Sequence, residues 1–103
     1  MKKNNLTLKE TFELAVGSYQ KKDFDTTQAL CSKILSINPD HLSSLVMLAN
    51  VAALNKNFKK ANEFLTKANE IEPNNLGILN NLGTTFKELG ELKKAINIYE
   101  KII

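Results

Sequence analysis

The sequence predicts an all-α protein, a solenoid in which three similar helix pairs are stacked in series. Two observations carry this prediction. The only prolines, Pro39 and Pro73, lie 34 residues apart, and a shift of 34 residues superposes apolar on apolar and small on small residues along the chain. Within each 34-residue unit the apolar residues recur every three or four positions in two blocks, which is the spacing of two amphipathic helices.

The superposed positions form sets of three, one residue from each unit, and each set keeps its chemical type. The clearest sets are Leu8, Leu42 and Leu76; Leu14, Leu48 and Leu82; Ala15, Ala49 and Gly83; and Phe24, Phe58 and Leu92. The third set is small in every unit, and a small residue lets two helices approach closely. We therefore expect the two helices of each unit to meet at this position.

The first unit is expected to hold helices over residues 7–21 and 24–37. Thr7, followed three residues later by Glu10, has the pattern of a capping box, which provides partners for unpaired amides at a helix start. The second helix is expected to end before Pro39, because proline disfavours helical geometry in the residue that precedes it.

The second unit is expected to hold helices over residues 41–55 and 58–71. Asp40 is predicted to cap the first of these helices, since its carboxylate can accept from free backbone amides. Asn57 lies in the turn between the helices, and Pro73 follows the second one as Pro39 does in the first unit.

The third unit repeats this order, with helices expected over residues 75–89 and 91–103. Asn74 is its predicted cap and Gly90 lies in its turn. Together the helices predict one domain over residues 7–103, preceded by a flexible leader over residues 1–6. The units cover about residues 8–41, 42–75 and 76–103, and the last is incomplete.

The charge of the chain argues against nucleic acid as its partner. The formal net charge is +3, and all 14 basic residues are lysine. Arginine is the residue that grips phosphate and reads guanine with two parallel hydrogen bonds, and it is missing here. The lysines also alternate with acidic residues, so we expect a solvated helix surface that binds no nucleic acid.

Cysteine use and hydropathy predict the compartment. Cys31 is the only cysteine and cannot form an internal disulfide, so nothing indicates an oxidising environment. No apolar run is long enough for a signal peptide or a membrane span. We therefore expect a cytoplasmic protein with no membrane contact.

The residues that could perform chemistry are few and scattered. The only histidine, His41, lies at a predicted helix start, and Cys31 falls on the buried face of a predicted helix, where it is expected to fill space in the core. One histidine and one cysteine do not make a metal site, and no glycine-rich phosphate loop is present. We therefore expect no catalytic residue, no cofactor and no metal, and hence no enzyme.

The third unit carries a recognisable pattern over residues 82–96. Leu82-Gly83, the aromatic Phe86, the turn residue Gly90 and Ala95 stand in the register that is typical of the tetratricopeptide repeat. The second unit keeps Ala61, Ala68 and Pro73, whereas the first departs most, with Ser18, Thr27 and Ile34 in place of the expected types. The chain thus resembles the tetratricopeptide-repeat family from about residue 7 onward.

This resemblance implies a right-handed superhelix whose first helices line a concave groove that binds a peptide or a helix of a partner protein. Helical phase then selects the residues of the first helices that point away from their own second helices. The predicted groove residues are Phe12, Val16, Tyr19, Val46, Met47, Asn50, Asn80, Asn81 and Thr84; the same faces carry Ser43, Leu54 and Gly77.

The predicted groove is apolar at one end and polar at the other. Phe12, Val16, Val46 and Met47 suit an apolar side chain, although Phe12 and Val16 have the alternative of being covered by residues 1–6 or by another chain. The asparagines offer both donors and acceptors to a peptide backbone. Asn81 resembles a member of the asparagine ladder found in arrays that precede glycosyltransferase domains.

Two classes of function follow from this reading. The first is a non-catalytic scaffold for a protein or peptide partner. The second is the N-terminal, substrate-presenting segment of a larger enzyme such as a glycosyltransferase or a sulfotransferase. The last unit stops about seven residues short of a full repeat without a polar capping helix, which favours the second class or self-association through the final helix. RNA binding by a related 35-residue repeat is disfavoured by the 34-residue step and by the lack of arginine.

Overall fold

The computed structural model describes residues 6–103, and these residues form six helices and no strand. The helices are α1 (Leu8–Gln20), α2 (Phe24–Ile37), α3 (Leu42–Leu54), α4 (Phe58–Ile71), α5 (Leu76–Glu88) and α6 (Leu92–Glu100). The predicted all-α solenoid is confirmed. The last helix ends at Glu100 rather than at residue 103, and the predicted leader lies outside the described residues except for Leu6, which is exposed.

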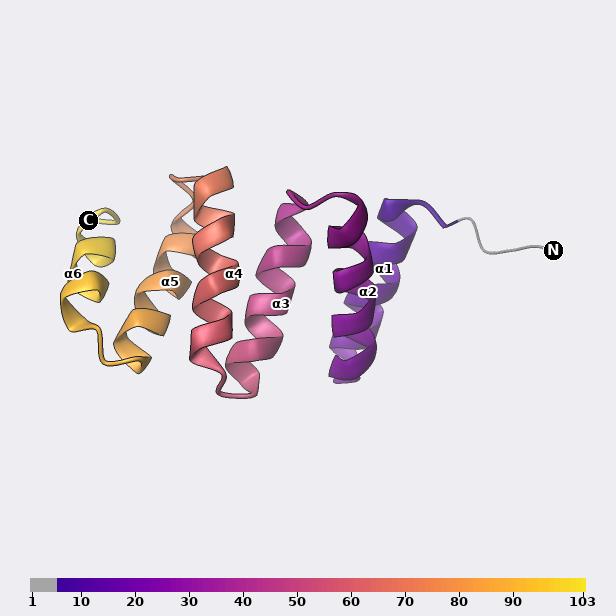
Figure 1. Cartoon of the computed structure of the whole chain (residues 1–103), viewed down its shortest axis with the longest axis horizontal. Helices are drawn as coiled ribbons and strands as arrows, with labels where there is room; N and C mark the ends of the chain where they lie inside the picture. Colours follow the sequence, from indigo (N-terminus) through magenta and orange to yellow (C-terminus); the bar gives the residue numbers. More distant parts are fainter. Residues whose placement is uncertain (1–5) are drawn as a thin grey trace.

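The helices are arranged in a row in chain order, with α1 and α2 at one end and α6 at the other (Figure 1). Each helix packs mainly against the helix before it and the helix after it. The molecule is accordingly elongated, measuring 54 × 24 × 19 Å along its principal axes. Such a row gives each residue neighbours from adjacent elements, which is the defining property of a solenoid.

The helix starts agree with the predicted caps at α1 and differ from them at α3 and α5. The Thr7 hydroxyl accepts from the Glu10 amide at 3.0 Å, and the Glu10 carboxylate accepts from the Thr7 amide at 3.0 Å, which completes the predicted capping box. At α3 and α5 the predicted caps Asp40 and Asn74 are wrong, because each helix begins one residue later than the sequence predicts. The caps there are His41, whose Nδ1 accepts from the Ser44 amide, and Asn75.

The core runs along the whole row, and the three small residues of the repeat lie inside it. Ala15 and Ala49 are 0% and 1% exposed, and Gly83 is also buried. Ala15 belongs to one cluster with Cys31, and Ala49 to another with Leu65. A Cβ atom built on Gly83 would lie 2.6 Å from the ring of Tyr99, which is too close for two carbon atoms.

The Gly83 position therefore gives a first prediction. The Gly83→Ala variant is expected to lose about 1 kcal/mol of unfolding free energy, because the overpacking cost of about 1–3 kcal/mol exceeds the gain of about 1 kcal/mol in helix propensity. Adding Tyr99→Leu, the residue type that faces Ala49 in the second unit, removes the clash. Urea denaturation of the two single variants and the double variant should show coupling between the positions, and additive losses would contradict the packing.

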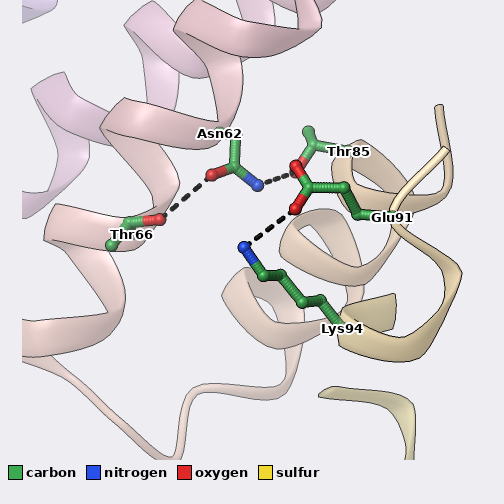
Figure 2. A network of polar contacts seen from close by, with 5 residues as sticks. All are labelled: Asn62, Thr66, Thr85, Glu91 and Lys94. Carbon is green, nitrogen blue, oxygen red and sulfur yellow. Dashed lines mark hydrogen bonds and ion pairs between the residues drawn. The ribbon is translucent and has the colours of Figure 1, made fainter. Parts of the chain in front are cut away.

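Polar contacts fix α4 against α5 as well (Figure 2). The Asn62 amide of α4 donates to the Thr85 hydroxyl of α5 at 2.8 Å, and that hydroxyl donates to the Leu82 carbonyl oxygen at 2.8 Å. Thr85 is only 3% exposed, so these bonds satisfy a buried hydroxyl. The nearby ion pair of Glu91 and Lys94, at 2.8 Å, is exposed and is expected to stabilise the fold little.

Candidate peptide-binding site

A pocket of about 340 Å³ opens between the first helices of the second and third units, α3 and α5. It exists because α3 and α5 each pack on α4 rather than mainly on each other, which leaves a gap between their exposed faces. We call it the α3–α5 pocket. Its lining residues are Leu42, Ser43, Val46, Met47 and Asn50 from α3, and Asn75, Gly77, Ile78 and Asn81 from the start and body of α5.

The floor of the α3–α5 pocket is apolar and packs against the core of the protein. Ile78 is 3% exposed and belongs to the main core, and Leu42 and Val46 pack partly against the same core. Met47 packs against the neighbouring cluster around Cys31. Because these side chains also hold the helices together, the floor is fixed in shape before any ligand arrives.

Amide groups surround this floor. The Asn50 side chain is half-buried and the Asn81 side chain is exposed, and neither forms a hydrogen bond with another residue of the range 6–103. Asn75 differs, since its Oδ1 accepts from the Ile78 amide at 3.1 Å and its Nδ2 donates to Glu72 at 3.1 Å. Of the three asparagines that line the pocket, Asn50 and Asn81 therefore retain side-chain donors and acceptors for a bound molecule.

The walls of the pocket carry no charge. No Asp, Glu, Lys or Arg occurs in α3, and α5 has none before Lys87 in its last turn. A charged ligand group would lose hydration here without gaining an opposite charge. The arrangement can therefore accommodate an apolar side chain together with neutral hydrogen-bonding groups such as those of a peptide backbone.

The structure brings four of the nine predicted groove residues into this pocket, namely Val46, Met47, Asn50 and Asn81. The other five lie elsewhere. Phe12 and Val16 are half-buried on α1, and Phe12 packs against the Cys31 cluster and the His41 ring, whose centroid is 5.3 Å away. Tyr19 packs edge to face with Phe24, and their ring centroids are 5.5 Å apart.

The two remaining predicted residues are on the far side of α5. Asn80 is exposed, and the Thr84 hydroxyl donates to the Asn80 carbonyl oxygen at 3.0 Å. The same hydroxyl lies 3.3 Å from the Tyr99 hydroxyl, so Thr84 faces α6. Three pocket residues had not been predicted: Leu42, Asn75 and Ile78. Leu42 and Ile78 lie one turn before Val46 and Asn81, a helical spacing that could have identified them.

Neither Cys31 nor His41 has the surroundings of a catalytic group. Cys31 is fully buried, as predicted for a core residue, and burial raises the pKa of its thiol, an effect that the neighbouring Ser44 hydroxyl opposes only in part. A thiol with a raised pKa is a poor nucleophile at neutral pH. Within residues 6–103 no three His, Cys, Asp or Glu side chains gather in a way that could hold a metal ion.

None of the six helices between residues 6 and 103 has both the length and the apolar character that crossing a bilayer requires.

Comparison with known proteins gives a consistent picture of the fold. The family model described as anaphase-promoting complex, cyclosome, subunit 3, a repeat of the tetratricopeptide type, matches residues 20–102. The UDP-N-acetylglucosamine-peptide N-acetylglucosaminyltransferase of Caenorhabditis elegans is 27% identical over 89 residues, which is 86% of this chain but 8% of the transferase. That match lies in the repeat region of the transferase.

Solved structures of the tetratricopeptide-repeat protein MamA superpose on most of the chain. One crystal structure of MamA has a TM-score of 0.88 with 14% identity and covers 95% of this chain and 57% of MamA. Another has a TM-score of 0.83 with 18% identity, over 92% of this chain and 52% of MamA. The chain thus spans little more than half of MamA, and at these identities the likeness extends to the fold alone.

Proposed function

Because the chain belongs to the tetratricopeptide-repeat family, whose fold serves protein-protein interaction, we propose that it is a non-catalytic scaffold. The scaffold binds an extended peptide of a partner protein in the α3–α5 pocket. The observation that carries the proposal is the combination, in one uncharged pocket, of a rigid apolar floor with the free amides of Asn50 and Asn81.

The proposed mode of binding follows from that combination. An aliphatic side chain of the peptide fills the space above Val46 and Met47. The Asn50 and Asn81 amides then hydrogen-bond backbone groups on either side of it, which favours an extended peptide without reading further side chains.

The chain acts as one domain over residues 7–103, made of units at about residues 8–41, 42–75 and 76–103. It works in the cytoplasm and binds neither nucleic acid nor membrane. It also self-associates through α6, where Leu92 and Ile96 are 58% and 55% exposed.

A second candidate function is supported by the transferase match. In this alternative the chain is the substrate-presenting repeat segment of a larger enzyme, as the 27% identity to the repeat region of a glycosyltransferase suggests. The gene sequence beyond the codon for Ile103 distinguishes the two, because only the second candidate requires a catalytic domain in the same reading frame.

Peptide binding in the α3–α5 pocket is tested with a displayed library of random peptides. Selected peptides should bind the Met47→Glu and Asn50→Ala variants at least about tenfold more weakly than the parent chain, a loss of about 1.4 kcal/mol. The matched controls are Leu14→Glu, at an exposed leucine of α1, and Asn97→Ala, at an exposed asparagine of α6. Equal binding by all four variants, or no enriched peptide, would contradict the proposal.

A further inference from the structure

A second cleft lies on the edge of the solenoid that holds the turns between the two helices of the first and second units. It has a volume of about 500 Å³ and is lined by Tyr19, Gln20, Lys22, Phe24, Leu54 and Asn55. We call it the edge cleft. These residues come from the end of α1, the start of α2 and the end of α3, at the lower edge of the molecule in Figure 1. They share no residue with the α3–α5 pocket.

The repeat itself shows that two apolar residues of the edge cleft, Tyr19 and Leu54, are not needed for packing. Tyr19 is replaced by Ala53 and Lys87 at the equivalent positions of the other units. Leu54 is 57% exposed, and its equivalents are the polar residues Gln20 and Glu88. A solenoid unit therefore folds with polar or small residues at both positions, and the leucine and tyrosine leave apolar surface in contact with water.

The same edge carries the excess positive charge of the protein. Residues 20–25 and 54–60 contain five lysines and two aspartates, a net charge of +3 that equals the formal charge of the whole chain. One aspartate, Asp23, is occupied as the cap of α2, where it accepts from the Thr26 amide and hydroxyl. None of the five lysines forms an ion pair with any residue between 6 and 103.

Two of these lysines, Lys22 and Lys56, lie in turns whose backbone is fixed by hydrogen bonds. Lys22 and Lys56 occupy equivalent turn positions and have φ angles of 63° and 60°, in the left-handed region. The Lys22 amide donates to the Tyr19 carbonyl at 3.0 Å, and the Lys56 amide donates to the Ala53 carbonyl at 2.9 Å. Lys22 lines the edge cleft, and Lys56 directly follows its lining residue Asn55 in the chain.

We propose that the edge cleft binds an acidic segment of a partner protein that carries one aromatic side chain. The aromatic ring of the partner enters beside the edge-to-face pair of Tyr19 and Phe24, which is the geometry that aromatic rings favour, and covers Leu54. Carboxylates on either side of it meet Lys22 and Lys56. This chemistry differs from that of the α3–α5 pocket, whose walls are uncharged, so the two sites select different segments.

The test uses synthetic peptides in which one phenylalanine is flanked on both sides by glutamates. Two matched peptides replace the phenylalanine by serine or the glutamates by lysines. At about 50 mM salt the acidic aromatic peptide should bind at least about tenfold more tightly than either, and its affinity should fall with added salt. Amide resonances of Lys22, Leu54 and Asn55 should shift during the titration, whereas those of Val46 and Met47 should not.

Variants taken from the chain itself complete the experiment. Leu54→Glu introduces the residue that the third unit carries at Glu88, so the helix end tolerates it, and it should weaken binding by about tenfold or more. Lys22→Gln combined with Lys56→Gln should weaken binding about threefold and flatten its salt dependence. Leu14→Glu makes the same change at an exposed leucine outside both sites and serves as the control that leaves binding unchanged, and circular dichroism verifies folding.

Several results would overturn the proposal. These are equal binding of the lysine-flanked peptide, shifts at the α3–α5 pocket in place of the edge cleft, or no saturable binding at about 1 mM peptide. A dimer in sedimentation velocity that Leu54→Glu abolishes would also overturn it, because the occupant would then be a second copy of the chain.

Discussion

Replacing Leu45 by alanine is expected to lower the free energy of unfolding by about 2–5 kcal/mol, the range for removing a large aliphatic side chain from a packed core. Leu45 is 2% exposed and lies in the cluster that joins α3, α4 and α5 through Leu65, Ile78 and Leu82. In a solenoid each unit depends on its neighbours for burial, so the cavity weakens two junctions at once.

The matched control for Leu45→Ala is Leu54→Ala, which makes the same chemical change at the exposed end of the same helix. Leu54 is 57% exposed, and its truncation is expected to change the free energy of unfolding by less than about 0.5 kcal/mol. Urea denaturation followed by circular dichroism measures both. Similar losses for the two variants would mean that the α3 face towards α4 and α5 is not the core.

Most of the fold could be predicted because each unit repeats the same pair of packed helices. The position shared by Ala15, Ala49 and Gly83 identified the close contact between paired helices, and the structure buries all three. The caps of α3 and α5 lie one residue after the predicted Asp40 and Asn74, because those two residues belong to the turns that precede the helices. The His41 amide donates to the Asn38 carbonyl in one turn, and the Asn75 amide donates to the Glu72 carbonyl in the other. His41 and Asn75 then accept from the Ser44 and Ile78 amides as the caps.

The pocket was harder to predict than the fold, because helical phase gives the direction of a side chain but not its neighbours. Phe12 was predicted to lie in the groove, whereas in the structure it is half-buried and its ring packs against the His41 ring from the next unit. Tyr19 lies near the end of α1, where the turn brings Phe24 beside it. Leu42 and Ile78 were missed for the opposite reason, since each contributes to the core and to the pocket.

The second large effect is expected from Ala49→Leu. Ala49 is 1% exposed and shares a cluster with Leu65 and Ala68 of α4, so a larger side chain has no space to enter. The variant is expected to lose about 1–3 kcal/mol of unfolding free energy, the usual cost of overpacking. For a domain of this size each kcal/mol lowers the thermal midpoint by about 4–8 °C, so calorimetry measures the effect directly.

Ala29→Leu is the matched control for Ala49→Leu. Ala29 is exposed on α2, and alanine and leucine have similar helix propensities, so the control should leave the thermal midpoint nearly unchanged. Ala49→Leu should have a second consequence that distinguishes overpacking from simple destabilisation. Pushing α3 away from α4 alters the gap between α3 and α5, so peptide affinity at the α3–α5 pocket should fall at temperatures where the variant is fully folded. Unchanged midpoints for both variants would contradict the close contact between α3 and α4.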